Sequence, residues 1–458
     1  MLSGSDIFIV RVMGKYLLYA PLHQLIALVD RAAVRCLLSA LQGKSTPVPA
    51  NIELLFSQLT TPVLQPQVRT GAVTNPLFLG IIPTRGCNMD CVYCDFAAPK
   101  QTSPVMDLSL ARAAVDAYLN LLPLDSQHAA IHFFGGEPFF APNVIHFVVA
   151  YATMRAAERG AALRFEVTTN GLYGTRQCRW IGDHFDTVVL SLDGLDEVQN
   201  RQRPALNGRA TFPTVARNAR ILSESPVNLV LRACVTQQSV TELVDFSHWV
   251  CQNLVVEAVC FETLIPSPLS IAADVLPPDP WKFAQEFDRA AAVLTAAGIE
   301  AVLSTAEITT CRLSFCPVGQ DALIVNPDGA VNACYLLPEQ WQQVGLDMRL
   351  GQLQPQIPAF ALDDAAVQRA RQLQVNNKSR CANCFCRYHC AGGCHVNHDS
   401  AVPTGTFDAW CVQTRLITIT RLLRHLEQHD LAATWIADKG GVEAAVYQST
   451  DCLLHQEI

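Results

Sequence analysis

The feature that most constrains the fold of this sequence is the regular alternation of short apolar runs with helical patterns between residues 77 and 297. The apolar runs that predict strands are 77–83, 129–134, 163–168, 187–192, 228–235 and 256–264, and the helical patterns fall near 107–121, 143–158, 175–183, 211–223, 240–252 and 281–297. Asp107 is the predicted N-cap of the first helix. Six such units predict an α/β fold with a parallel sheet, because each parallel crossover needs a helix that covers the sheet. We expect this sheet to curve into a partial (β/α)6 barrel of the TIM type.

The segments on either side of this core differ from it in pattern. The predicted organisation is a small N-terminal α+β unit at 1–76, the core at 77–300, a cysteine-rich domain at 301–428 and a weakly structured tail at 429–458. The N-terminal unit is predicted to contain a hairpin, with strands at 7–12 and 16–19, and helices at 22–42 and 51–59. The cysteine-rich domain is predicted to close with an amphipathic helix at about 412–428.

Composition excludes several classes of protein. The formal net charge is −8 and the 33 Lys and Arg residues form no basic run, which argues against nucleic acid as a partner. No apolar stretch reaches the ~18 residues needed to span a bilayer, and residues 1–14 lack the basic and apolar regions of a signal peptide. We therefore expect a cytoplasmic protein without a membrane partner. Eighteen cysteines in such a reducing compartment indicate metal or cluster ligation rather than disulfides.

Three of these cysteines stand in one short loop directly after the first predicted strand. Cys87, Cys91 and Cys94 have the spacing Cys-x3-Cys-x2-Cys. Three thiolates from one loop can hold three irons of a [4Fe–4S] cube and leave the fourth iron for another ligand. The alternative is a zinc site, but structural zinc takes four protein ligands, and this loop contains no fourth Cys or His.

This loop resembles the signature of the radical S-adenosylmethionine (SAM) superfamily, and one further motif of that family follows each of the next predicted strands. Gly135-Gly136-Glu137-Pro138 resembles the loop that receives the amino group of SAM, and Thr169-Asn170-Gly171 follows the third strand. Ser191-Leu192-Asp193-Gly194, with Arg203 beyond it, resembles the pair that holds the SAM carboxylate in the peptide-modifying branch. The residues that the resemblance assigns to SAM are Tyr93, Gly135, Gly136, Glu137, Asn170, Ser191, Asp193, Arg203 and Leu264.

A second group of cysteines resembles the SPASM extension of radical SAM peptide maturases. Its pattern is Cys316-x12-Gly329-x4-Cys334, then Cys381-x2-Cys384-x5-Cys390-x3-Cys394, then Cys411, with Cys311 as an eighth cysteine. The resemblance implies two auxiliary [4Fe–4S] clusters. The first would be held by Cys311, Cys316, Cys334 and Cys394, and the second by Cys381, Cys384, Cys390 and Cys411.

The alternative for this region is a pair of zinc knuckles, because Cys-x2-Cys pairs are common in zinc ribbons. Cys386 lies outside the pattern as a spare or reactive thiol, and we expect His395 and His398 to be surface or hydrogen-bonded side chains. The remaining cysteines are expected to be small apolar fillers: Cys36, Cys178, Cys234, Cys251, Cys260 and Cys452.

The resemblance implies a cofactor set and a reaction. One electron from the cluster would cleave SAM to methionine and a 5′-deoxyadenosyl radical, which takes hydrogen from a substrate carbon. Auxiliary clusters would carry away the further electron that an oxidised product, such as a ring or cross-link, releases. The implied partners are a ribosomally made precursor peptide and an electron donor such as flavodoxin or ferredoxin. The N-terminal unit resembles leader-binding winged-helix domains, in which an extended leader adds to a strand edge; the alternative is that it only shields the barrel.

Three other functions compete with a peptide maturase. The nearest is an anaerobic sulfatase maturase, in which an acidic residue follows the auxiliary-cluster cysteine, whereas Tyr335 follows Cys334 here. Tyr335 and Glu262 are the candidates for the proton acceptor. A non-catalytic zinc or iron-sulfur interaction protein is the alternative of another class. A tRNA-modifying radical enzyme is disfavoured, because the chain is acidic and has no basic RNA-binding appendage.

Overall fold

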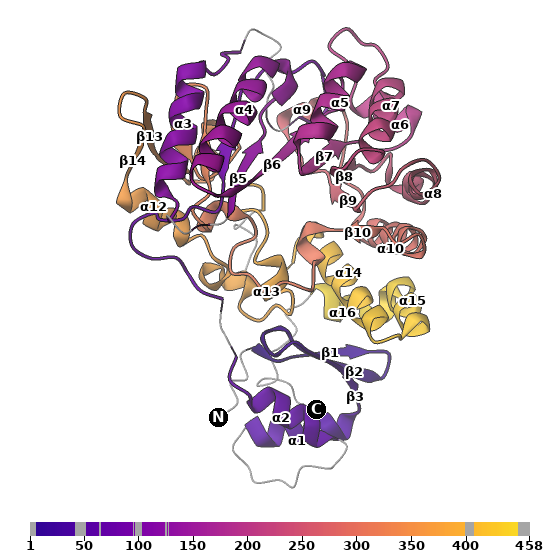
Figure 1. The fold of residues 1–458 in the computed structure, drawn as a ribbon. Helices are drawn as coiled ribbons and strands as arrows, with labels where there is room; N and C mark the ends of the chain where they lie inside the picture. The colour runs from indigo at the N-terminus through magenta and orange to yellow at the C-terminus, as the bar shows by residue number, and fades with distance from the viewer. Residues whose placement is uncertain are drawn as a thin grey trace.

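Six parallel strands form the centre of the protein, as seen in a computed structural model that describes residues 6–41, 52–63, 66–94, 96, 103–123, 126, 128–398 and 407–447 (Figure 1). Each strand pairs in parallel with the next one along the chain. They are β4 (Leu79–Ile81), β5 (His128–Phe133), β6 (Ala162–Thr169), β7 (Thr187–Ser191), β8 (Asn228–Val235) and β9 (Ala258–Thr263). The predicted partial barrel of parallel strands is therefore confirmed.

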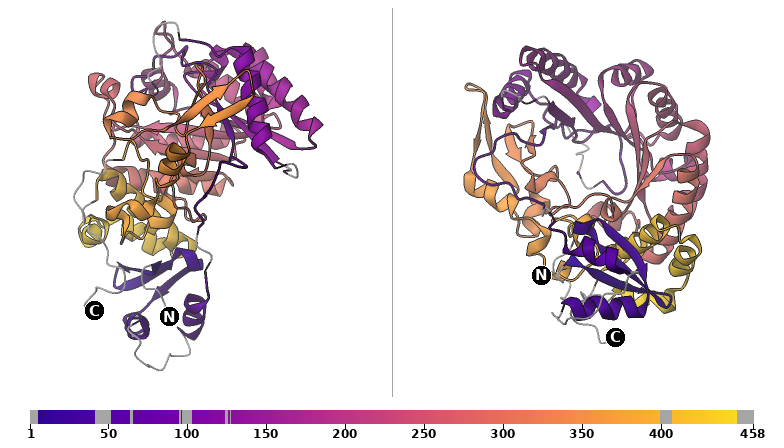
Figure 2. Two further views of the ribbon diagram at one scale, coloured as in Figure 1. Left: turned by 90° about the vertical axis from the view of Figure 1, so that its left-hand side faces the viewer. Right: turned by 60° about the horizontal axis from the view of Figure 1, so that its bottom comes forward.

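Helices cover the outer face of these strands, and Figure 2 shows them as an arc around the sheet. They are α3 (Leu108–Leu121), α4 (Pro142–Glu158), α5 (Thr175–His184), α6 (Asp196–Gln202), α7 (Phe212–Ser223), α8 (Leu243–Asn253) and α10 (Pro280–Ala296). Asp107 caps α3 as predicted, and its carboxylate accepts a hydrogen bond from the Ser109 amide at 2.7 Å. Successive side chains of a strand lie on opposite faces of the sheet. In β8, Leu229 and Leu231 are buried under the helices, whereas Arg232 points to the interior of the barrel.

The cysteine-rich region is joined to the barrel through its sheet. β10 (Glu300–Val302) extends one edge beside β9, and β11 (Leu323–Val325) pairs in parallel with β4 at the other edge. Three antiparallel strands continue from β11 to give an 11-stranded sheet: β12 (Ala330–Asn332), β13 (Arg349–Gln354) and β14 (Ala359–Leu362). Cys334 lies two residues after the end of β12, so this pairing brings it to the barrel. The short helices of the region are α11 (Pro338–Gln343), α12 (Asp364–Arg371) and α13 (Arg387–Cys390), whereas the short helix α9 (Pro268–Ala272) lies between β9 and α10 of the barrel.

The N-terminal unit is a three-stranded antiparallel sheet with two helices, at the bottom of Figure 1. Its elements are β1 (Phe8–Val12), β2 (Lys15–Ala20), β3 (Leu25–Val29), α1 (Arg31–Leu41) and α2 (Glu53–Thr60). The predicted hairpin is present, but the prediction of one helix over 22–42 is wrong in its first part. Residues 25–29 form β3, because a short apolar run fits a strand as well as a helix and β2 offers it a partner.

The C-terminal part consists of three helices, α14 (Ala409–His425), α15 (His429–Ala437) and α16 (Lys439–Tyr447). The predicted closing helix corresponds to α14, whereas the expectation of a weakly structured tail from residue 429 is wrong for α15 and α16. Both are short helices that are stabilised by packing, since Trp435 and Val442 are buried. Residues 448–458 lie outside the described residues. None of the helices in the described part of the chain is long and apolar enough to cross a membrane.

Candidate functional site

A cavity of about 570 Å³ lies at the carboxyl ends of the barrel strands. The residues that sequence reasoning assigned to the two cofactor regions meet on its wall, although they are up to 307 positions apart along the chain (Cys87 to Cys394). The predicted residues that line it are Cys87, Cys91, Tyr93, Cys94, Gly135, Gly136, Asn170, Ser191, Arg203, Glu262, Leu264, Cys316, Cys334, Tyr335 and Cys394. The cavity therefore faces both the first cysteine loop and part of the cysteine-rich domain.

The three cysteines of the first loop present their thiols to this cavity. The loop is anchored by hydrogen bonds, including that from the Val92 amide to the Gln202 carbonyl at 3.1 Å. Burial raises the pKa of Cys91 to about 12; the Arg203 charge opposes this rise, and the Cys94 and Cys87 thiols add to it. Crowded thiols that resist ionisation need bound cations to become thiolates. Three soft donors beside a cavity are the set that a cluster with one non-protein ligand requires, so the residues present fit the group.

Gly135 and Gly136 form a turn that packs directly on the base of the cysteine loop. Gly135 has φ +145°, a conformation that side chains rarely adopt, and a Cβ on Gly136 would lie 2.2 Å from the Gly86 carbonyl oxygen. Only glycine allows the two loops to approach this closely.

Glu137 belongs to the same motif, but it is not among the residues that line the cavity. Its side chain is buried beneath the wall, where its carboxylate accepts hydrogen bonds from the Asn170 amide (2.7 Å), the Thr169 hydroxyl (2.9 Å) and the Phe139 amide (3.0 Å). Burial raises the pKa of Glu137 to about 7, and these hydrogen bonds oppose the rise. Glu137 therefore fixes the loop that carries Asn170.

Asp193 likewise holds two residues of the cavity wall in place, Tyr93 and Arg203. Its fully buried carboxylate accepts hydrogen bonds from the Tyr93 hydroxyl at 2.5 Å and from Arg203 Nε at 2.9 Å. The guanidinium of Arg203 lies over the Tyr93 ring, 5.4 Å from its centroid, and its Nη1 is 4.0 Å from Cys91 Sγ. Asp193 thus orients a cation and an aromatic ring next to the first cysteine loop, without lining the cavity itself.

Three of the four cysteines assigned to the first auxiliary cluster, Cys316, Cys334 and Cys394, also line the cavity. Burial raises the pKa of Cys334 to about 12, and the neighbouring thiols of Cys316 and Cys394 add to the rise. Cys311 is elsewhere: its thiol donates to the carbonyl oxygen of Pro21, at 3.5 Å, in the N-terminal unit. The structure therefore assembles three members of this predicted set and separates the fourth.

The four cysteines assigned to the second cluster form a compact group away from the cavity. Burial raises the pKa of Cys411, and the thiols of Cys384, Cys390 and Cys381 raise it further. Arg415 Nη1 donates to Cys384 Sγ at 3.1 Å, and its guanidinium lies between two aromatic rings, Phe385 at 4.3 Å and Phe407 at 4.2 Å. Four mutually close thiols beside a buried cation suit a fully ligated anionic cluster.

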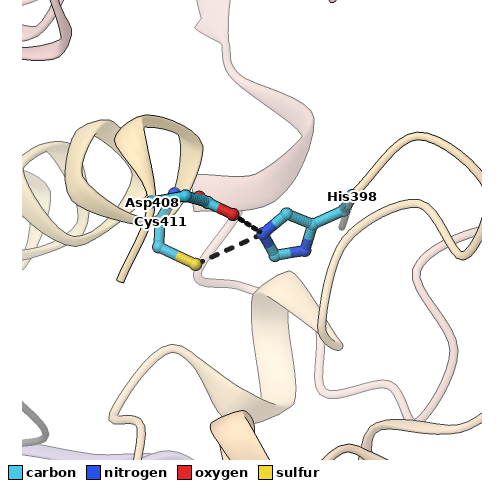
Figure 3. A group of neighbouring side chains, drawn as sticks. All are labelled: His398, Asp408 and Cys411. Carbon is cyan, nitrogen blue, oxygen red and sulfur yellow. Dashed lines mark hydrogen bonds and ion pairs between the residues drawn. The ribbon is translucent and has the colours of Figure 1, made fainter. Parts of the chain in front are cut away.

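His398 was expected to be either a surface side chain or a hydrogen-bonded one, and it is hydrogen-bonded. It contacts Cys411 of the four-cysteine group (Figure 3). Its Nε2 lies 2.9 Å from Asp408 Oδ2 and 3.3 Å from Cys411 Sγ, and its Nδ1 lies 2.9 Å from the Gly392 carbonyl oxygen. Asp408 also caps α14 by accepting a hydrogen bond from the Cys411 amide at 2.8 Å. These three side chains lie close enough to hold a metal ion together, but Cys411 already belongs to the four-cysteine group.

The two candidate proton acceptors both lie on the cavity wall but differ in chemistry. Burial raises the pKa of Tyr335, and Glu166 and Cys334 raise it further, so the hydroxyl stays protonated and acts as a donor. Glu262 Oε1 accepts hydrogen bonds from the Ser304 amide at 3.1 Å and from the Cys260 thiol at 3.3 Å. Because the Tyr335 hydroxyl stays protonated, it cannot take up a proton, and the Glu262 carboxylate is the better acceptor of the two.

Sequence reasoning missed three residues of the site. Cys234 was expected to be an apolar filler, but it lines the cavity, as does Arg232 two residues before it. Arg85 donates to the Tyr335 carbonyl and to Asn326 Oδ1, both at 2.8 Å, and so connects the first cysteine loop to the cysteine-rich domain. Alternation along the strand 228–235 was the available signal for Arg232 and Cys234; an isolated arginine in a loop such as Arg85 carries none.

Comparisons with known proteins agree with this architecture. The sequence profile described as "Radical SAM superfamily" matches residues 81–249. The serine-type anaerobic sulfatase-maturating enzyme of Klebsiella aerogenes is 25% identical over 329 residues, which cover 68% of this chain and 78% of that enzyme. The solved structure of anSMEcpe with bound AdoMet and Cp18Cys peptide has a TM-score of 0.59 at 19% identity, covering 77% of this chain and 99% of that one.

A second solved structure shares the fold over a longer stretch. Streptococcus suis SuiB bound to S-adenosylmethionine has a TM-score of 0.51 at 14% identity, covering 87% of this chain and 96% of that one. The order of strands, the cysteine loop after the first of them and the matched profile lead to one conclusion. This chain carries a radical SAM domain and is related to the anaerobic sulfatase-maturating enzymes.

Proposed function

We propose that this protein is a radical SAM/SPASM peptide maturase that removes hydrogen from a side chain of a ribosomally made peptide and leaves an oxidised product such as a ring or cross-link. The observation that carries the proposal is the shared cavity. Cysteines of the first loop and Cys316, Cys334 and Cys394 of the cysteine-rich domain line the same cavity. A substrate held there would contact the site where hydrogen is removed and the site where an electron leaves.

In this proposal the first loop holds a [4Fe–4S] cluster through Cys87, Cys91 and Cys94. When bound, this cluster and SAM supply a carbon radical that takes hydrogen from an unactivated carbon. Arg203, which is oriented by Asp193, would hold the SAM carboxylate through its guanidinium N–H groups. Ser191 and the Gly135-Gly136 turn offer further polar contacts on the wall, and Tyr93 and Leu264 offer an apolar surface for adenine.

The oxidised product requires that one more electron and one proton leave the substrate after the hydrogen atom. Cys316, Cys334 and Cys394 would hold an electron acceptor against the cavity, and the second cysteine group would lie behind it as the exit. We assign the proton to Glu262, because its carboxylate lies on the wall and Tyr335 remains protonated. A flavodoxin or ferredoxin is the proposed electron donor to the first loop.

Two observations support a peptide as the substrate. The anSMEcpe structure that shares this fold contains a bound Cp18Cys peptide. In addition, β3 pairs with β2 on one side, and no strand of the described residues pairs with its other edge. An extended leader peptide would form backbone hydrogen bonds along this edge. The N-terminal sheet is also tied to the cysteine-rich domain, since the Tyr19 hydroxyl lies 3.3 Å from His389 Nδ1.

The experiment that tests the function starts with anaerobic reconstitution. We expect about twelve irons per chain, from three cubes, and formation of 5′-deoxyadenosine on reduction with SAM. The variant with Cys87, Cys91 and Cys94 replaced by Ala should retain the iron of the auxiliary clusters, about eight atoms per chain. It should form no 5′-deoxyadenosine. Stoichiometric zinc without SAM cleavage would instead support the non-catalytic interaction protein.

The product is tested by co-expression with short peptides that are encoded next to the gene. A peptide whose mass falls by two hydrogens would support the maturase. The second candidate function is a sulfatase maturase, which the 25% identity to the Klebsiella aerogenes enzyme favours. Conversion of a Ser- or Cys-containing sulfatase peptide to an aldehyde, detected by hydrazide trapping, would establish that function instead.

A further inference from the structure

Lys378 lies between the two groups of auxiliary cysteines. Burial lowers the pKa of the Lys378 ammonium, and four nearby thiols oppose this fall: Cys381 and Cys390 from the second group, and Cys394 and Cys316 from the first. Arg312 has a related position, because its charge interacts electrostatically with the thiols of Cys390 and Cys316. Its Nε donates a hydrogen bond to the His389 carbonyl at 2.8 Å. Two cations therefore occupy the space between two sets of sulfur ligands.

The backbone and side chain of Lys378 contact segments that belong to different groups. Its carbonyl oxygen accepts a hydrogen bond from the Cys381 amide at 2.9 Å, within the second group. Its Nζ donates to the carbonyl oxygens of Gly392 (2.7 Å) and Gly393 (3.3 Å), which connect Cys390 with Cys394. One residue thus links the ligand segments of both groups.

The position of the Lys378 side chain is defined by a slot that only glycine permits. Gly392 has φ +79°, and a Cβ there would lie 2.6 Å from Lys378 Cδ. The ammonium is therefore held in place by packing as well as by its two hydrogen bonds. A surface lysine would instead sample several rotamers and screen its charge with water.

We propose that Lys378 sets the reduction potentials of both auxiliary clusters and so keeps the electron exit of the proposed maturase open, a role that rests on the proposed function. Each cluster gains one negative charge when it is reduced. A half-buried cation near both sets of ligands stabilises the two reduced states, because charges interact more strongly away from bulk water. Lys378 carries no electron; it makes transfer from the substrate side to the second cluster more favourable.

The test measures the auxiliary clusters without the first one. Full-length protein with Cys87, Cys91 and Cys94 replaced by Ala is reconstituted with iron and sulfide, and each midpoint potential is obtained by EPR-monitored titration. Lys378→Met and Lys378→Gln should each lower the equilibrium constant for reduction of both clusters by about tenfold. For a one-electron reduction, this lowers each midpoint potential by ~59 mV. Lys378→Arg, which keeps the charge, should restore both.

The matched control removes a cation that acts on one group only. Arg387 influences Cys381 of the second group, so Arg387→Met should leave the first auxiliary midpoint unchanged. If Lys378→Met loses iron, the midpoints of Lys378→Gln are used to test the role of the charge, since Gln retains a donor for the glycine carbonyls. Full iron content with unchanged midpoints, or a shift of one cluster alone, would overturn the role of Lys378. A triple alanine protein that binds no iron even with Lys378 intact would overturn the proposed function as well.

Discussion

The carboxylate of Asp193 and the guanidinium of Arg203 form a buried ion pair at the wall of the barrel cavity, with 2.9 Å between Oδ1 and Nε. The same carboxylate holds the hydroxyl of Tyr93. Because Nε of Arg203 is occupied by Asp193, the terminal nitrogens are the donors left for a ligand. One acidic side chain thus positions two proposed SAM contacts at once.

Replacing Arg203 by Ala is expected to weaken SAM binding by about tenfold to a hundredfold, because a charge-assisted hydrogen bond contributes ~1.5–3 kcal/mol. Folding should be less affected, since Asp193 still accepts hydrogen bonds from Tyr93, Gln202 and the Cys234 amide. The measurement is equilibrium dialysis of labelled SAM against reconstituted protein, with the thermal midpoint as the control. Unchanged SAM affinity would remove Arg203 from the site.

Gly136→Ala is expected to prevent assembly of the first cluster. The added methyl would lie 2.2 Å from the Gly86 carbonyl oxygen and 2.4 Å from that of Arg85, so the cysteine loop must move. About four of the twelve irons should be lost, together with SAM cleavage. Gly174→Ala is the matched control, because a Cβ there meets nothing within 4 Å. Equal iron content in the two variants would contradict the packing argument.

Cys311 and Cys334 are expected to respond differently to replacement by Ala. Cys334 lies with Cys316 and Cys394, whereas the Cys311 thiol points to Pro21. Cys334→Ala should therefore lose the iron of the first auxiliary cluster, about four per chain, and Cys311→Ala should retain it. Iron and sulfide analysis of the two proteins measures this directly. Similar losses from both would return Cys311 to the ligand set.

Glu137 is expected to make stability depend on pH in an unusual direction. Its pKa is raised from 4.5 to about 7 in the folded protein, so folding favours the protonated form. The stability from this group is complete below about pH 4.5 and is lost as pH rises through about 7, by up to ~3 kcal/mol. As the pH rises from 5 to 8, the thermal midpoint of the wild type should therefore fall relative to that of Glu137→Gln. A constant difference would show that Glu137 ionises normally.

Local patterns in the sequence were sufficient for the barrel and for most of the cavity wall. Alternating apolar runs and helical periods predicted β4 to β9 and their helices, because the carboxyl ends of parallel strands lie at one edge of a sheet whatever their exact length. The same reasoning predicted that Cys87, Gly136, Asn170 and Ser191 would meet, since each follows a different strand. It failed for β3 and for α15 and α16, where a partner strand or a packing surface decided the conformation of a short segment.

Cysteine spacing by itself determined how many sulfur donors this protein offers and in which segments they stand. Tertiary structure alone decided which donors meet: the pairing of β11 with β4 carries Cys334 to the barrel cavity, while Cys311 turns to the N-terminal unit. It also decided that Glu137 and Asp193 lie beneath the wall and that Lys378 lies between the two cysteine groups. The reason is physical: spacing constrains neighbours along a chain, whereas side-chain direction and burial depend on segments that are distant in sequence and are packed together only in the folded protein.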